Sequence, residues 1–327
     1  VLGEGVAWIV GWALVLEYTI AASTVCVGWA GYVNGLLEHA GFGLPHILQV
    51  GPMDGGSFNL LACLIGLAIT GLLVVGTSKS ARVNTVLVLV KIVALTAFIF
   101  VALPAVKDQN FTPFVPNGWG SPMGGIGVLG AAASIVFAYI GFDAISTAAE
   151  ETKNPNRNIP IALIGSLGVC TIYYLLVSYA AVGSVGAQPM LGPNGLALEP
   201  GTPAFAAACD GSQALVCSKE ALAHVVRLLN HNTVAAFIAF AAGIALPSVI
   251  LTMTYGQTRI FFTMSRDGLL PTSLAKIHPR FHTPHVITLI TGVFVSLFGA
   301  LFSVGILADI TTAGTLFSFM MVALGVL

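Results

Sequence analysis

Four charged side chains interrupt long apolar stretches or lie where two of them join, and such groups are the first candidates for chemistry inside a membrane. They are Glu17, Lys91, Asp143 and Asp309, out of 12 basic and 13 acidic residues. An ionisable group within a membrane span marks a functional site by default, because its burial in lipid is costly. A carboxylate such as Glu17 can pair with a guanidinium or ammonium group, which suits a cationic ligand. Lys91 lies too deep for easy snorkelling, so it needs a partner or must be neutral for part of a cycle.

Residues 124–160 contain the most informative of these features. Residues 125–149 form an apolar run of about 25 residues, long enough to cross a bilayer as a helix, and Asp143 is its one charge. Because Gly141 and Asp143 both penalise a continuous helix at mid-membrane depth, we expect the helix to open there with its backbone facing a cavity. Asp143 suits either a ligand pocket or the N-cap of a second half-helix. The run also matches G-x-G-x-x-G, but no strand precedes it, which argues against a dinucleotide site.

The elements that must position these residues are membrane helices. The chain is 57% hydrophobic and 8% charged, whereas soluble domains are about 25% charged. Apolar runs without strand signals predict eight spanning helices, and the net charge of −1 argues against a nucleic-acid partner. The runs cover residues 5–37, 58–77, 83–106, 125–149, 159–185, 233–255, 286–307 and 310–327.

The loops between the runs indicate the orientation. With the first residue on the cytoplasmic side, eight Lys or Arg residues fall in cytoplasmic loops and three in external loops, as the positive-inside rule requires. The predicted cytoplasmic loops are 78–82, 150–158 and 256–285, and the predicted external loops are 38–57, 107–124 and 186–232.

Several other residues favour ordinary structural roles. Asp309 suits a helix cap near the join of the last two runs, and the Gly31-x-x-x-Gly35 spacing is typical of close helix packing. Cys209 and Cys217 lie in a polar external loop, where a disulfide and two free thiols both stay open. Three histidines resemble solvated loop residues more than metal ligands, because no acid or thiol lies near them in the sequence; they are His278, His282 and His285.

A family resemblance rests on two stretches. FAYIGFDAISTAAEETKNPNRNIP, at residues 137–160, resembles the sixth helix and following loop of the cationic amino-acid transporter branch of the amino acid–polyamine–organocation superfamily. QTRIFFTMSRDGLLPTSLAKIHPRFHTPH, at residues 257–285, resembles that family's loop between helices eight and nine. The resemblance covers the whole chain and implies an all-α membrane protein with the LeuT-type inverted-repeat fold. We expect residues 1–327 to form one transporter domain, with helices three to ten of about twelve and without the first two and the last.

The resemblance also implies a binding site. Glu17 and Asp143 would be two acids of a pocket for the substrate's side chain, although Glu17 could instead form a structural hydrogen bond to a neighbouring helix. The carbonyl groups around Phe137, Ala138 and Ile140 would receive the substrate's α-amino group. Phe137 would be the aromatic lid over that group, or a core packing residue.

The implied function is secondary active transport of cationic amino acids across the plasma or inner membrane by alternating access. By the same resemblance, Lys91 would lie where sodium-driven members of the family bind their sodium ion. This implies a proton-linked, sodium-independent cycle. The alternative role of Lys91 is that of a structural cation. The expected partners are a cationic amino acid, the proton and the lipid bilayer, with no cofactor or metal. A carrier of neutral amino acids or polyamines is the alternative. An integral-membrane enzyme would need clustered His or Asp residues at one face, and the sequence pattern has none; a channel is a further possibility.

Overall fold

The computed structural model describes residues 3–76, 80–115, 118–120, 127–142, 152–189, 191–193, 198, 202–209, 212, 214–279 and 283–326. Every regular element in these ranges is a helix, as the sequence predicts. Within the described residues, five helices are long and apolar enough to cross a membrane, and three apolar helices are shorter. Each of the eight predicted runs therefore contains one apolar helix.

The eight apolar helices follow one another along the chain in the order of the runs, although several of their ends differ from those of the runs. In chain order they are α1 (Glu4–His39), α3 (Leu60–Val75), α4 (Ser80–Ala102), α5 (Gly127–Ser134) continued by the 3-10 helix η5 (Ile135–Tyr139), α7 (Pro155–Val185), α10 (Asn232–Arg266), α11 (His285–Leu301) and α12 (Val304–Val326).

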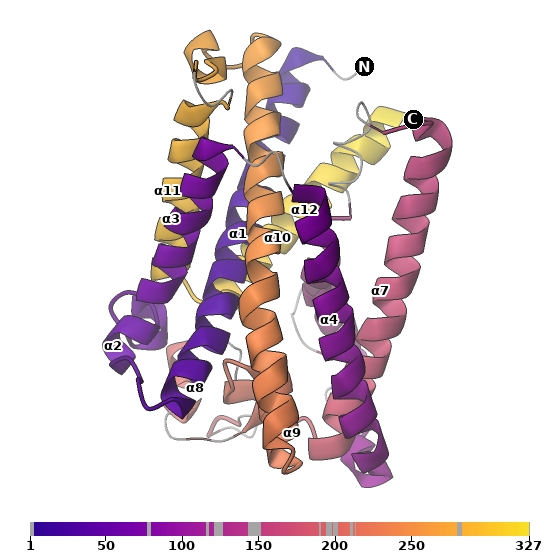
Figure 1. The fold of residues 1–327 in the computed structure, drawn as a ribbon. Helices are drawn as coiled ribbons and strands as arrows, with labels where there is room; N and C mark the ends of the chain where they lie inside the picture. Colours follow the sequence, from indigo (N-terminus) through magenta and orange to yellow (C-terminus); the bar gives the residue numbers. More distant parts are fainter. Residues whose placement is uncertain are drawn as a thin grey trace.

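Short helices fill the connections between these elements. Three of them, α2, α8 and α9, lie together at one end of the bundle (Figure 1) and belong to the two longest predicted external loops. These loops thus cover that end of the bundle. The short helices are α2 (His46–Gln49), η1 (Pro52–Asp54), η2 (Leu103–Ala105), η3 (Asp108–Phe111), α8 (Pro203–Cys209), η7 (Leu215–Cys217), α9 (Ala221–Leu228) and η8 (Thr272–Ala275).

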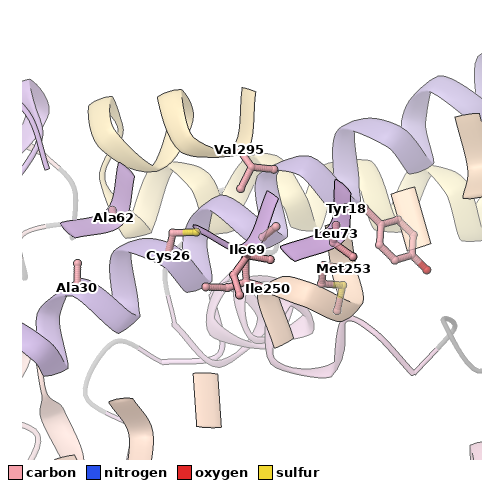
Figure 2. Close-up of a cluster of buried hydrophobic side chains, with 10 residues drawn as sticks. Tyr18, Cys26, Ala30, Ala62, Ile69, Leu73, Ile250, Met253 and Val295 are labelled. Atoms are coloured by element: carbon pink, nitrogen blue, oxygen red, sulfur yellow. The ribbon is translucent and has the colours of Figure 1, made fainter. Parts of the chain in front are cut away.

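Helix α1 is the centre of the bundle. It packs against α10, α12, α11 and α3, and small residues along it let these neighbours approach closely. Its contacts with α3, α10 and α11 enclose a central cluster of buried side chains, shown in Figure 2. The cluster comprises Tyr18, Ala22, Cys26, Ala30, Ala62, Ile69, Leu73, Ile250, Met253 and Val295.

Helices α3 and α11 form a close pair through two reciprocal glycine contacts. A Cβ atom at Gly66 of α3 would lie 2.5 Å from Ser296 Oγ of α11. A Cβ atom at Gly292 of α11 would overlap the side chain of Thr70 of α3. Each glycine thus accepts a hydroxyl-bearing residue of the partner helix, which is how membrane helices gain packing contact without a hydrophobic driving force.

Gly292→Ala is expected to lower the free energy of unfolding by about 1–3 kcal/mol, because the added methyl group overpacks the contact with Thr70. Thermal unfolding in detergent measures the change. Gly71→Ala in α3 is the matched control, since a Cβ atom there meets nothing within 4 Å. That control gains up to about 1 kcal/mol from helix propensity. Equal stability of the two variants would contradict the close packing of α3 on α11.

The structure corrects the boundary between the last two helices. The sequence predicts a join near residues 308–309 with Asp309 as a cap, but α11 ends at Leu301 and α12 begins at Val304. Ser303 is the residue that caps α12, because its hydroxyl oxygen accepts from the Ile306 N–H at 3.5 Å. Asp309 lies within α12 and accepts a 3.3 Å hydrogen bond from Ser134 Oγ. The prediction that Asp309 caps a helix is wrong because the Ser303 hydroxyl, and not the Asp309 carboxylate, lies at the start of α12.

Two predicted loops are shorter than expected for a related reason. Helix α10 continues to Arg266, well into the range 256–285, and α7 begins at Pro155 within the range 150–158. Hydropathy detects only the apolar part of a helix, whereas backbone hydrogen bonding continues until a residue such as Gly268, whose φ is 81°, ends it.

The Gly31-x-x-x-Gly35 motif packs against the loop at Lys219 and Glu220 and not against another helix. The prediction that it mediates close helix packing is therefore wrong. A Cβ atom at Gly31 would lie 2.7 Å from the backbone oxygen of Lys219, and one at Gly35 would overlap the Glu220 carboxylate. The docked loop carries the disulfide between Cys209 and Cys217, which selects one of the two alternatives that the sequence left open.

Candidate functional site

The segment predicted to open does lose its regular helix. Helix α5 changes to 3-10 geometry at Ile135, and η5 ends at Tyr139. Ile140 is extended, with φ −59° and ψ 135°, and Gly141 has φ 106°, a conformation that side chains with a Cβ atom rarely adopt. Asp143 lies outside the described residues, which stop at Phe142 in this part of the chain.

Contacts with α10 hold the break in place. A Cβ atom at Gly141 would lie 2.5 Å from Met253 Cε, the end of a flexible side chain, so it is the positive φ of Gly141 that requires glycine here. Ile140 packs against the central cluster, of which Met253 is a member. The break therefore lies against the central cluster.

Helix α7 supplies polar partners to the same break. The carbonyl oxygen of Phe137 accepts from the Ile140 N–H at 3.1 Å, whereas that of Ala138 accepts a 2.7 Å hydrogen bond from the Tyr174 hydroxyl. The Tyr139 hydroxyl lies 3.2 Å from Thr171 Oγ1. Carbonyl groups at the end of a helix have no partner within the helix, so they can accept from a side chain or from a ligand ammonium group. The sequence did not indicate Tyr174, because tyrosine in an apolar helix has no special pattern.

Glu17 lies at the contact between α1 and α12. Its side chain is 0% exposed, and a Cβ atom at Gly314 of α12 would lie 3.8 Å from Glu17 Cβ. Its neighbour Tyr18 belongs to the central cluster. Gln257 of α10 donates a hydrogen bond to Thr19, two residues after Glu17. The acid is thus enclosed by the helices that surround α1.

Lys91 bridges α4 and α10. Its ammonium group donates a 3.0 Å hydrogen bond to Ser248 Oγ, and Ser248 in turn donates to the Ala245 carbonyl oxygen at 2.7 Å. Five residues separate Ser248 from Met253, about 7.5 Å along the axis of α10. One helix therefore holds both the partner of Lys91 and the residue packed against Gly141. The sequence could have pointed to Ser248 as a hydroxyl next to Pro247 in an apolar helix.

A second polar group of residues lies at the end formed by the short helices. It surrounds a cavity of about 440 Å³ beside α9, lined in part by His39, Glu220 and Arg227. Glu220 and Arg227 form an ion pair there. Lys219 Nζ lies 3.4 Å from Gln49 Oε1, and burial lowers the pKa of Lys219, opposed by the nearby Glu38 and Asp54 carboxylates.

Among the described residues, no group of three His, Cys, Asp or Glu side chains has the arrangement of a metal site. The rings of His278 and His285 lie edge to face at 4.9 Å, and His282 lies outside the described residues. The break after Tyr139 and Lys91 are therefore the main candidates for a functional site.

Comparison with known proteins gives one family and several relatives. Residues 1–327 match the family described as "Amino acid permease". The chain is 40% identical to the branched-chain amino acid permease BcaP of Bacillus subtilis (strain 168), with 100% of the chain and 64% of the relative covered. It is 37% identical to the methylthioribose transporter of the same organism, with 100% and 64% covered. It is 33% identical to the vacuolar cationic amino acid transporter 4 of Arabidopsis thaliana, with 100% and 50% covered. The chain thus spans less than two thirds of the length of these relatives.

Proposed function

The chain belongs to the amino acid permease family, and we propose that it is a multi-pass secondary active transporter that moves amino acids by alternating access. The observation that carries this proposal is the break after Tyr139, where an apolar helix turns to 3-10 geometry and ends beside the packed α10. Broken helices near the bilayer midplane offer backbone groups to a polar substrate in LeuT-type inverted-repeat transporters. We extend that fold to this protein as part of the proposal.

A neutral amino acid with a branched aliphatic side chain is the first candidate substrate. The relative at 40% identity is named as a branched-chain permease, whereas the relatives named as cationic transporters, of which the 33% identical Arabidopsis thaliana protein is one, are less similar. This order reverses the expectation drawn from the sequence, where a cationic amino acid came first. The general class, an amino acid carrier, is the same in both.

A cationic amino acid is the second candidate because of one residue. Glu17 is a fully buried carboxylate in the middle of α1, and carboxylates form strong charge-assisted hydrogen bonds with guanidinium and ammonium groups. If Glu17 and Asp143 line the side-chain pocket, the cationic group of a substrate side chain would bind there during transport.

The backbone of the break is the proposed site for the α-amino group, which every amino acid shares. Its ammonium group would donate to the carbonyl oxygens around Phe137, Ala138 and Ile140, and the Phe137 ring would cover it. The Tyr174 hydroxyl occupies the Ala138 carbonyl oxygen in this structure. A backbone carbonyl oxygen can accept two hydrogen bonds, so a substrate ammonium group would share this oxygen with the Tyr174 hydroxyl or replace it, which links the site to α7.

Lys91 is the proposed coupling residue of a proton-linked, sodium-independent cycle. Its ammonium group ties α4 to α10 through Ser248, and loss of the proton would remove the positive charge, weaken this hydrogen bond and let the two helices separate. The group is half-buried within an apolar helix, where an ion pair or hydrogen bond has a large effect because water is scarce.

A binding panel tests the substrate class. Ligand at about 100 times its Kd stabilises a protein by roughly 2.7 kcal/mol, so leucine, isoleucine and valine are expected to raise the unfolding temperature of the complete protein in detergent. Arginine and lysine are expected to raise it less. Stabilisation by arginine alone would favour the second candidate, and no stabilisation by any amino acid would contradict the proposal.

A further inference from the structure

Helix α10 contains a proline in its interior, Pro247. Proline has no backbone N–H, so the carbonyl oxygen four residues before it, that of Gly243, loses its usual helical partner. In a membrane such prolines are tolerated where neighbouring helices supply a replacement. The Gly243 carbonyl oxygen therefore needs a donor from outside α10.

The replacement comes from α1. The indole Nε1–H of Trp29 donates a 2.7 Å hydrogen bond to the Gly243 carbonyl oxygen. Trp29 is half-buried and packs against the central cluster, so its ring has a fixed position from which the N–H reaches across to α10. Tryptophan suits this role because it joins a large apolar ring to a single donor.

The same region of α10 holds the partner of Lys91. Ser248 follows Pro247 directly, donates to the Ala245 carbonyl oxygen at 2.7 Å and accepts from Lys91 Nζ at 3.0 Å. The position of the Ser248 hydroxyl therefore depends on the backbone geometry around the proline. The hydrogen bond from Trp29 to the Gly243 carbonyl oxygen, one turn before the proline, holds this part of the α10 backbone.

We propose that Trp29 is a positioning residue: its indole N–H holds the proline break of α10 and thereby places the Ser248 hydroxyl that receives Lys91. The proposal rests on the proposed coupling role of Lys91 for its effect on transport. The hydrogen bond between Trp29 and the freed carbonyl of Gly243 does not depend on that role.

A double-mutant cycle tests the bond itself. Trp29→Phe keeps an aromatic ring and removes the donor, whereas Pro247→Ala restores a backbone N–H to the Gly243 carbonyl. Trp29→Phe is expected to lower the folded-to-unfolded ratio of the complete protein about tenfold, within the range for leaving a buried acceptor unpaired. In the Pro247→Ala background the same substitution is expected to cost less than about threefold, because the acceptor is already paired. Equal losses in both backgrounds would overturn the bond and leave only ring packing.

Transport measurements test the positioning role. Trp29→Phe is expected to lower the ratio of pH-driven accumulation to substrate counterflow about tenfold, since weakening of the Lys91 contact impairs coupling. Ser248→Ala is expected to have the same effect. Trp29→His, which keeps a ring N–H donor, is expected to recover part of that ratio. Trp8→Phe is the matched control, because Trp8 is also on α1 but 44% exposed. A fall in both activities by the same factor would mean that Trp29 is only structural.

The two proposals fail in different ways. If Lys91→Ala retains pH-driven accumulation, the coupling proposal is wrong, yet the cycle with Pro247→Ala still tests the Trp29 bond by unfolding. If that cycle is additive, the inference about Trp29 is wrong, yet transport and its dependence on Lys91 are unaffected.

Discussion

Lys91→Ala is expected to abolish accumulation of substrate driven by a pH gradient while leaving part of the exchange activity intact. The substitution removes the only group in the proposed cycle that gains and loses a proton, and with it the 3.0 Å hydrogen bond from α4 to Ser248 of α10. Exchange requires the substrate site to alternate but does not require net proton movement. It therefore survives where accumulation does not.

The measurement is uptake by the complete protein in proteoliposomes under an imposed proton gradient, with and without sodium. Lys107→Ala is the control, because Lys107 is exposed and lies beyond the end of α4. Sodium is expected to make no difference to the unsubstituted protein. Accumulation that persists in Lys91→Ala, or a requirement for sodium, would remove Lys91 from the mechanism.

Glu17→Gln is expected to weaken binding of arginine far more than binding of leucine. Removing one partner of a desolvated charged pair costs about 2–5 kcal/mol, roughly 30-fold or more in Kd. Leucine has no side-chain charge to lose, so its Kd is expected to change by less than about threefold, the limit expected when no charged contact is removed. Glutamine keeps the shape of the enclosed side chain, which limits the effect on packing against α12.

Competition binding with labelled leucine measures both affinities. Glu4→Gln is the matched control, since Glu4 is exposed at the start of the same helix. An equal loss for arginine and leucine would assign Glu17 to a structural role between α1 and α12. That result would also remove the residue that favours the cationic candidate.

The sequence was sufficient for the helices but not for their ends. Eight apolar runs each contain an apolar helix, because the hydrophobic requirement of a membrane span is visible in composition alone. The boundary at Ser303 was missed because a single hydroxyl that caps a helix leaves the hydropathy of the run almost unchanged. The extension of α10 to Arg266 was missed for the converse reason, since backbone hydrogen bonding continues the helix beyond its apolar residues.

The candidate site could be predicted only in part. Gly141 and the charged Asp143 lie two residues apart in an apolar run, so the break was predictable from local chemistry. Trp29 and Tyr174 were not, because each matters through a partner far away in sequence, Gly243 and Ala138. Ser248 had one signal, the adjacent Pro247, but its partner Lys91 is also distant in sequence. The docking of the loop at Lys219 onto Gly31 is of the same kind. Glycine spacing indicates that something approaches closely, but it does not say what.

Counterflow is the most direct test of the central proposal that this protein is an amino acid carrier. Proteoliposomes containing the complete protein are loaded with unlabelled leucine and diluted into a trace of labelled leucine. A carrier that alternates between two sides is expected to give transient, saturable accumulation of the label that excess isoleucine abolishes and that empty vesicles lack. Flux that neither saturates nor responds to internal leucine would indicate a pore, and the absence of counterflow with every amino acid would contradict the proposal.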